Sequence, residues 1–259
     1  MMNQIIYGIH SIQTLLTCEP HRFLEVFVMH GHKDRNLMLL IAKLEKIGIV
    51  VQLAHRRWLN KEAASGVHQG IIARVLQGRE YQEKNLPSLL KQSKNPPLLL
   101  ILDGVTDPHN LGACLRSADA AAVDMVIIPK DRSAQLNATA KKIACGAAET
   151  VPLIPVTNLA RTMRYLQDHK VWIFGTVIEA NKSLYQINIT SQIALALVMG
   201  SEGNGLRRLT RAHCDELIRI PMAGSLASLN VSVATGICLF ELVRQRSQFS
   251  CKDLTINVE

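Results

Sequence analysis

The stretch LLLILDGVTDPHNLGACLR (98–116) gives the strongest fold signal in this chain. Its first six residues, LLLILD, have no polar side chain before Asp103, which is typical of a strand buried on both faces of a parallel sheet. After a turn, Asn110 stands where the N-cap of a helix running to about Ala122 is expected. We therefore predict a strand and a covering helix, the first βα unit of a parallel sheet.

The same alternation continues to the end of the chain. Further apolar runs predict strands at 125–129, 151–156, 171–177, 193–200 and 217–222, and several of them are separated by helical patterns. A last helix is expected from about Leu229 to Arg246. Strands that alternate with helices predict an α/β domain over 98–259, built on a mostly parallel sheet covered on both faces.

The first part of the chain predicts a smaller α/β domain over residues 1–76. Its expected helices are 9–16 and 36–47, and its expected strands are 24–29, 49–54 and 70–76. The second helix places Leu37, Leu40, Ile41 and Leu44 on one face and stops at Gly48. Residues 77–97 are polar and end in two prolines, so we interpret them as a linker with room for a short helix.

Composition indicates a folded protein with a mild preference for polyanions. Of 259 residues, 48% are hydrophobic and 19% charged, which excludes disordered and fibrous classes. The formal net charge is +8, and residues 1–95 hold 13 Lys+Arg against 7 Asp+Glu, or +6, leaving 16 against 14, or +2, for the rest. The basic first third suits an RNA-docking module, although a solvated basic face explains the charge equally well.

Cysteine usage and hydropathy predict a reduced, cytoplasmic protein. The six cysteines contain no C-x-x-C pair, so neither a disulfide framework nor a zinc site is supported, and we expect no metal. No apolar stretch approaches the roughly 20 residues of a membrane span. The start, MMNQIIYGIH, lacks the features of a signal peptide. We expect no membrane partner.

Three strand-to-loop junctions hold the unusual residues, where parallel sheets bind ligands. The middle one, VMGSEGNGL (198–206), is neither a P-loop nor a dinucleotide fingerprint, and its glycines could form a tight turn. The third, IPMAGSLASLNVS (220–232), either lets backbone groups approach a ligand or is a flexible loop with an Asn230 cap. In the first, Arg116 is either a phosphate or ribose clamp or a surface salt bridge to Asp119.

Together these junctions resemble a known family. N-x-x-x-x-x-R (110–116), M-G-S-E-G (199–203) and I-P-M-x-G-S-x-x-S-L-N-V-S (220–232) resemble the three motifs of the SpoU/TrmH ribose methyltransferases. YGIHSIQTLL (7–16) and VHQGIIARV (67–75) extend the resemblance over nearly the whole chain. They are most similar to the bacterial members that methylate a guanosine of 23S rRNA.

The resemblance implies a fold and an activity beyond what spacing shows. It implies a deep C-terminal trefoil knot, a ribosomal-protein-like RNA-binding domain before it, a homodimer, and transfer of a methyl group from S-adenosylmethionine to a ribose 2′-hydroxyl of 23S ribosomal RNA. The positions that match the family's active site are Asn110, Arg116, Glu202, Ser228 and Asn230. Those that match the donor site are Gly200, Ile220, Met222 and Leu229.

The expected mechanism leaves the general base unidentified. An arginine stays protonated far above neutral pH, so Arg116 is expected to clamp an RNA phosphate and stabilise developing charge rather than to remove a proton. His109 precedes Asn110 and could equally be a turn residue. Two alternatives remain open, a methyltransferase acting on tRNA or another rRNA site, and a non-catalytic rRNA-binding assembly factor. An oxidoreductase is disfavoured because an early glycine fingerprint is missing.

Overall fold

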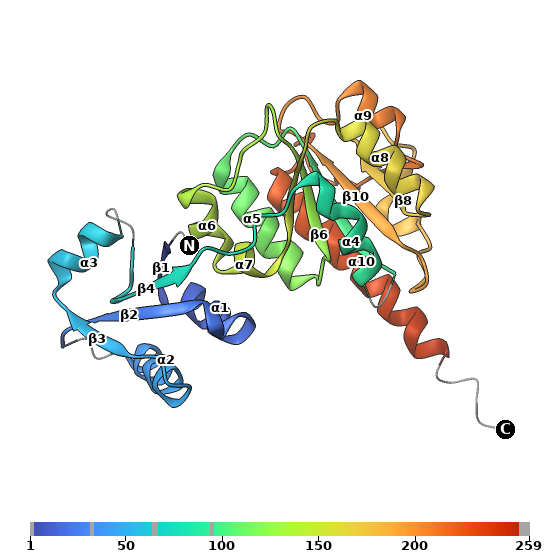
Figure 1. Ribbon diagram of the computed structural model, residues 1–259. Helices are drawn as coiled ribbons and strands as arrows, with labels where there is room; N and C mark the ends of the chain where they lie inside the picture. The colour runs from blue at the N-terminus through green and yellow to red at the C-terminus, as the bar shows by residue number, and fades with distance from the viewer. Residues whose placement is uncertain (1–2, 32–33, 64–66, 94–95, 254–259) are drawn as a thin grey trace. The chain divides into compact units, whose positions relative to one another are not determined.

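The computed structural model describes residues 3–31, 34–63, 67–93 and 96–253, with side chains up to residue 247. Residues 1–2 and 254–259 of the predicted domains, and 94–95 of the predicted linker, lie outside the described residues. Contacts divide the chain into two compact units, which are shown in Figure 1. The first comprises Met1–Glu80 and Cys145–Thr150, and the second Tyr81–Ala144 and Val151–Glu259.

The first unit is a small sheet with helices. Its elements are β1 (Asn3–Tyr7), α1 (Ile9–Cys18), β2 (Phe23–Met29), α2 (Arg35–Lys46), β3 (Val51–Ala54), α3 (Arg56–Glu62), β4 (Ile71–Leu76) and α7 (Ala147–Thr150). The strand order is β1-β4-β2-β3, antiparallel except for the β2–β3 pair. The predicted helices and strands are present within a few residues. Strand β1 and helix α3 were not predicted, because their short polar-rich segments show little periodicity.

Helix α2 illustrates why the local sequence adopts this structure. Asp34 caps it, because its side chain accepts the Leu37 backbone N–H at 2.9 Å. Leu37, Leu40 and Leu44 are buried on one face, as predicted. Gly48 has a φ of +84°, so the left-handed turn that ends the helix suits glycine.

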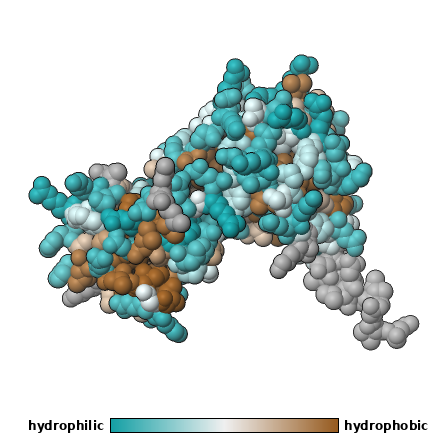
Figure 2. All heavy atoms as spheres, viewed as in Figure 1, coloured by the Kyte–Doolittle hydropathy of each residue, from teal (hydrophilic) through white to brown (hydrophobic). Residues whose placement is uncertain are grey.

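Hydrophobic side chains also reach the surface of the first unit. Figure 2 shows them gathered on its visible face. The exposed large hydrophobic residues of this unit are Leu24, Met38, Leu39, Ile47, Val50, Leu53 and Val67.

The second unit is built on a seven-stranded sheet. Its strands are β5 (Leu98–Asp103), β6 (Met125–Pro129), β7 (Leu153–Val156), β8 (Trp172–Thr176), β9 (Lys182–Ser183), β10 (Leu195–Gly200) and β11 (Glu216–Arg219). Its helices are α4 (Leu86–Gln92), α5 (Pro108–Ala120), α6 (Ala138–Ala144), α8 (Leu159–Asp168), α9 (Arg208–Ala212) and α10 (Val231–Asp253). The strand order is β7-β6-β5-β10-β8-β11-β9, and every pairing is parallel, which confirms the predicted α/β class.

Helices cover the sheet because its strands are apolar on both faces. On one face Leu99, Ile101 and Val198 join a core with α4 and α8, to which α8 contributes Met163 and Leu166. Successive residues of a strand point to opposite faces, so Leu98, Leu100 and Leu102 are buried against the other layer. On that side α10 packs against both α5 and β10.

Three predicted boundaries were wrong. Helix α5 begins at Pro108 rather than at an Asn110 cap, because Asp107 caps it and a proline fits the first helical position. Strand β11 ends at Arg219 instead of residue 222, since Pro221 cannot donate to a ladder. Helix α10 begins at Val231 and continues to Asp253, past the expected end at Arg246.

Two further features of the fold bear on the predictions. In the part of the chain that the structure describes, we find no helix long and apolar enough to cross a membrane. The trefoil knot stays a prediction.

Candidate functional site

The candidate site lies at the carboxyl edge of the parallel sheet, where central strands β5 and β10 end side by side. Asp103, the last residue of β5, is in register with Gly200, the last residue of β10. The loops that follow these strands therefore begin next to each other. The loop after β10 contains Glu202, and the loop after β5 leads into α5, which contains Asn110; both are predicted site residues.

Asn110 is held on the first turns of α5. Asp107 accepts the His109 backbone N–H at 2.8 Å, and Pro108 occupies the first helical position. The pKa of Asp107 is lowered first by this backbone hydrogen bond and then by the one from the His109 ring. Asn110 is the third residue of the helix and is 8% exposed, so its amide points into the protein rather than into solvent.

Glu202 stands on a tight loop that closes over the end of β10. Ser201 and Gly205 exchange backbone hydrogen bonds of 3.1 and 3.0 Å. The loop folds so closely that a Cβ on Gly200 would lie 2.3 Å from the Gly205 carbonyl carbon. Gly200 is therefore required by the path of the backbone, and the space above it is taken by the loop.

A buried carboxylate anchors this loop. The side chain of Asp103 is fully buried, and Oδ2 accepts the Arg207 backbone N–H at 3.0 Å. Oδ1 accepts Arg207 Nε at 2.5 Å and also pairs with the terminal guanidinium nitrogen Nη2. Charge-assisted, forked hydrogen bonds of this kind fix orientation. Neither residue was predicted as part of the site, although a single acidic residue at the end of an apolar strand was a signal for Asp103.

Asn110, Glu202 and Asn230 form one hydrogen-bonded network. Glu202 Oε1 accepts Asn110 Nδ2 at 2.5 Å and Asn230 Nδ2 at 3.0 Å. Asn230 Nδ2 also donates to Asn110 Oδ1 at 3.1 Å. The structure thus brings together three of the five predicted catalytic residues, which are separated by up to 120 positions in the sequence.

The chemistry of the network fixes both amides. A carboxylate only accepts hydrogen bonds, so both asparagine NH₂ groups must face Glu202. The Asn230 Oδ1 atom accepts the Ser232 backbone N–H at 2.9 Å and Ser232 Oγ at 2.6 Å, so Asn230 also opens α10. Glu202 therefore meets the first turns of α5 and α10, where helix dipoles favour negative charge.

Beneath the network, α5 and α10 are joined by a buried contact. Cys114 Sγ lies 3.5 Å from Thr235 Oγ1. Burial raises the pKa of the Cys114 thiol to about 11, opposed by the Thr235 hydrogen bond, so this thiol acts as a packing group. Burial also raises the pKa of the Cys214 and Cys238 thiols to about 12. Among the described residues, no group of histidine, cysteine or acidic side chains could hold a metal ion.

The predicted donor residues lie at the same edge of the sheet. Gly200 ends β10, Ile220 follows β11, and Leu229 comes just before α10. The exposed segment 221–229 contains Met222 and has no regular structure. Within the described part of the chain, its backbone groups make no hydrogen bond to other residues. An irregular segment with unused N–H and C=O groups suits a ligand contacted largely by backbone.

Two predicted catalytic residues lie outside the network. Arg116 is exposed on α5, six residues after Asn110 and so about 9 Å further along the helix axis. Ser228 is exposed two residues before Asn230. One chain therefore assembles part of the predicted site.

The chain is similar in sequence to known methyltransferases over most of its length. The model of the SpoU rRNA Methylase family matches residues 97–240, and that of an RNA 2′-O ribose methyltransferase substrate-binding domain matches 5–81. The chain is 66% identical over 245 residues to a 23S rRNA (guanosine-2′-O-)-methyltransferase RlmB of Yersinia pestis, covering 95% of this chain and 98% of the relative. It is 67% identical over 246 residues to the RlmB of Escherichia coli K12, covering 95% and 100%.

Solved structures share the fold. The SpoU methyltransferase AviRb of Streptomyces viridochromogenes, in complex with AdoMet, matches with a TM-score of 0.73 at 20% identity over 95% of this chain and 91% of that one. The TrmH/SpoU tRNA modifying enzyme of A. aeolicus matches with a TM-score of 0.55 at 28% identity over 66% and 87%. With its motifs, its sheet and these relatives in agreement, the chain belongs to the SpoU rRNA Methylase family.

Proposed function

We propose that this protein transfers a methyl group from S-adenosylmethionine to the ribose 2′-hydroxyl of a guanosine in 23S rRNA, in the cytoplasm. The observation that carries the proposal is the Asn110–Glu202–Asn230 network at the carboxyl edge of the sheet. The relatives named for this reaction are 65–67% identical over nearly the whole chain. A fold match alone would not distinguish an enzyme from an RNA-binding factor.

The donor is assigned to the loops around the network. Gly200, Ile220, Met222 and Leu229 would hold it, largely through the backbone of 221–229, which is unused in the protein's own hydrogen bonding. Bound there, S-adenosylmethionine would supply the methyl group from a sulfonium, whose sulfur is a good leaving group because it departs as a neutral thioether. The loop over Gly200 is fixed by Ser201, Gly205 and the Asp103–Arg207 pair, so one wall of this site is preorganised.

In the proposed reaction the protein orients the ribose and the donor and stabilises the charge that develops between them. A bond would form between the ribose oxygen and the methyl carbon as the carbon–sulfur bond breaks. The sulfur would leave as a neutral thioether, and the hydroxyl proton would pass to solvent water. Holding the reactants in line can supply a large part of the acceleration. Asn110, Glu202 and Asn230 are proposed to orient the ribose, Ser228 to contact it, and Arg116 to bind the adjoining phosphate.

A homodimer is part of the proposal. Helix α10 buries Cys238, Leu239 and Leu242, but leaves Val233 and Phe240 each 51% exposed. Leu226 is 72% exposed on the neighbouring loop. A second subunit would cover this apolar surface beside the site and bring further groups to it. Sedimentation of Phe240→Glu should show a monomer of reduced activity, whereas an active wild-type monomer would contradict the dimer.

The chemical product tests the function. Alkali cleaves RNA through the 2′-hydroxyl, so a 2′-O-methyl group protects the bond on its 3′ side. Purified protein, S-adenosylmethionine and a 23S rRNA fragment should give one alkali-resistant bond, at a guanosine. Incorporated methyl without a gap in the ladder would indicate base methylation, and binding without incorporation would favour an assembly factor. A tRNA substrate methylated in its place would indicate the sister activity.

A further inference from the structure

The loop after β6, residues 130–135, lies next to the network and has no assigned role. Strand β6 is the neighbour of β5 on the side away from β10, so this loop emerges beside Asp107 and Asn110. The Ala134 N–H donates to the Val105 carbonyl at 2.7 Å, which ties the two loops together.

Gly104 shows how near this loop comes to Glu202. A Cβ on Gly104 would lie 3.8 Å from the Arg132 carbonyl oxygen and 3.8 Å from Ser201 Cβ. The Arg132 backbone and the Ser201 side chain therefore flank one glycine, and Glu202 follows Ser201 directly. Neighbouring strands are about 5 Å apart, so the β6 and β10 loops are separated by about two strand spacings.

The loop is held in shape from within. The Gln135 amide nitrogen Nε2 donates to the carbonyls of Pro129 and Lys130, each at 3.2 Å, and of Ser133 at 3.3 Å. The Lys130 N–H is bound to the Val156 carbonyl at 2.9 Å. A loop that is already ordered by its own hydrogen bonds loses little further conformational entropy when it binds a ligand.

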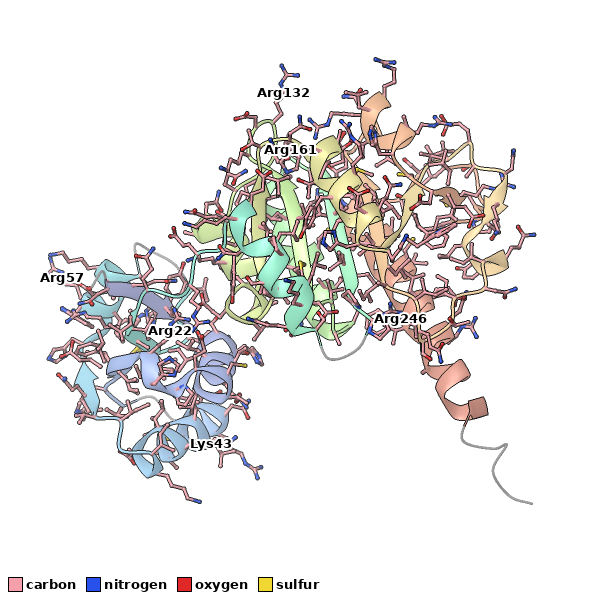
Figure 3. All side chains as sticks on the ribbon, turned by 45° about the vertical axis from the view of Figure 1, so that its right-hand side comes forward. Arg22, Lys43, Arg57, Arg132, Arg161 and Arg246 are labelled. Atoms are coloured by element: carbon pink, nitrogen blue, oxygen red, sulfur yellow. The ribbon has the colours of Figure 1, made fainter. Side chains whose placement is uncertain are left out.

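Arg132 stands at the tip of this loop. Its φ is +56°, a left-handed conformation that is uncommon for a residue with a side chain. The side chain is exposed and points away from the sheet into solvent, as Figure 3 shows. In the described part of the chain it pairs with no carboxylate; Asp131 is its nearest acidic neighbour in sequence.

The other side of the carboxyl edge offers a different surface. Beyond β10 lies β8, and after it Glu179 is paired with Arg211 at 3.3 Å. Lys182, at β9, is paired with Glu216 at 2.6 Å. Arg211 and Lys182 are each neutralised by a carboxylate, so a polyanion would gain less at these two cations than at Arg132.

From this placement we infer that Arg132 binds a backbone phosphate of the RNA strand that carries the target nucleotide, with Lys130 contributing beside it. The inference rests on the proposed function, because that function brings an RNA strand to the Asn110–Glu202–Asn230 network. The β6 loop lies beside the network. An RNA strand whose target ribose is bound at the network can therefore place a neighbouring phosphate at Arg132. A guanidinium suits phosphate because its forked donors match two phosphate oxygens.

The test variant is Arg132→Gly. Glycine adopts a φ of +56° without strain, so the change removes the charge and leaves the loop conformation. The control is Lys170→Gly, because Lys170 is also exposed, basic and left-handed, with a φ of +63°, but precedes β8 at the opposite edge of the sheet. Arg132→Lys keeps a cation at the tip.

Binding of a 23S rRNA fragment is measured against salt concentration without donor, and S-adenosylmethionine binding is measured separately. Arg132→Gly should weaken RNA binding about tenfold and reduce the salt slope of log K by about 1, the effect of losing one phosphate contact. Lys170→Gly should match the wild type, and Arg132→Lys should recover most of the slope. The donor affinity should not change.

Three outcomes would overturn the inference: a slope unchanged by Arg132→Gly, an equal loss in Lys170→Gly, or a main defect in donor binding. The proposed function is tested separately by the wild-type protein. If wild type methylates RNA and Arg132→Gly binds RNA as well as wild type, only the inference fails. If wild type transfers no methyl group, the function fails, and the salt slopes still decide whether Arg132 contacts RNA.

Discussion

The two edges of the seven-stranded sheet use similar polar residues for different purposes. At the amino edge, side chains satisfy backbone groups: Asp124 accepts the Leu98 N–H at 2.8 Å and Asp215 accepts the Ile173 N–H at 2.8 Å. Arg246 donates to the carbonyls of Pro97 at 3.1 Å and Ile193 at 2.5 Å, and Figure 3 labels it on α10.

At the carboxyl edge, side chains bind one another. Asn110, Glu202 and Asn230 form hydrogen bonds among themselves. Asp103 and Asn230 each combine such a side-chain partner with a backbone N–H, that of Arg207 and that of Ser232. Caps at the amino edge stabilise strands that are already paired. The network at the carboxyl edge positions groups without completing the sheet, which is the arrangement expected of a site rather than of a scaffold.

The largest loss of turnover is expected for Glu202→Ala. The change removes the acceptor shared by both asparagine amides, so their orientation is lost while the exposed position costs little stability. We expect turnover to fall about 100-fold, as for other misplaced catalytic groups, with a nearly unchanged melting temperature. Single-turnover methyl transfer and calorimetry measure the two effects. A large fall in melting temperature with little loss of turnover would make Glu202 structural.

A smaller loss of turnover is expected for Asp103→Asn. Asp103 both stabilises the fold and positions the loop that carries Glu202, so this change should affect stability and turnover together. The amide NH₂ would oppose the Arg207 donors, so the loop bearing Glu202 should loosen. We expect about tenfold slower transfer and a lower free energy of unfolding, by about 1.5–3 kcal/mol, because the lost hydrogen bonds involve charged groups. Arg207→Lys keeps the backbone donor and a charge, and should lose less of both. Equal turnover in Asp103→Asn and wild type would show that the loop needs no anchor.

Asp124→Ala should give the reverse pattern. It leaves the Leu98 N–H and the Ser93 hydroxyl, bound at 2.8 and 2.9 Å, without their acceptor. The free energy of unfolding should fall by about 1–3 kcal/mol, and the melting temperature by about 2–4 °C for each kcal/mol. Turnover at 25 °C should stay at the wild-type value. Reduced turnover of the folded variant would show that a change at the amino edge affects the site at the carboxyl edge.

The smallest effect is expected for His109→Ala. His109 is exposed, and its ring contacts only Asp107, at 3.1 Å, among the contacts the structure describes. A general base contributes about 10²–10⁴-fold, so a loss below about tenfold would exclude that role. Transfer rates from pH 6 to 9 provide the measurement. A loss of 100-fold, together with a lost ionisation in the pH profile, would identify His109 as the missing base.

Much of the fold could be predicted because the buried strands have simple compositions. The runs at 98–103 and 125–129 became β5 and β6 at the predicted residues. The boundaries that were predicted wrongly depended on single residues. Asp107 rather than Asn110 caps α5, because its side chain accepts the His109 backbone N–H. Short polar elements such as α3 left no periodic signal.

The residues of the site could be predicted from the motifs, but the contacts among them could not. The motifs named Asn110, Glu202 and Asn230, yet their meeting depends on strand order, which sequence patterns do not reveal. The Asp103–Arg207 pair was missed for the same reason, because its members are 104 positions apart. Arg116 and Ser228 stay predictions for the active site, as do the four donor positions.

The separation of Asn110 from Asn230 also sets an order of events on the ribosome. Translation adds about 5–20 residues per second, so about 6–24 s pass between the two residues. During that interval the rest of α5 and all of β10 are made, but Asn110 and Glu202 have no Asn230 to bind. The nascent chain therefore cannot complete its network until synthesis reaches α10, so any activity that depends on the network can arise only late in synthesis.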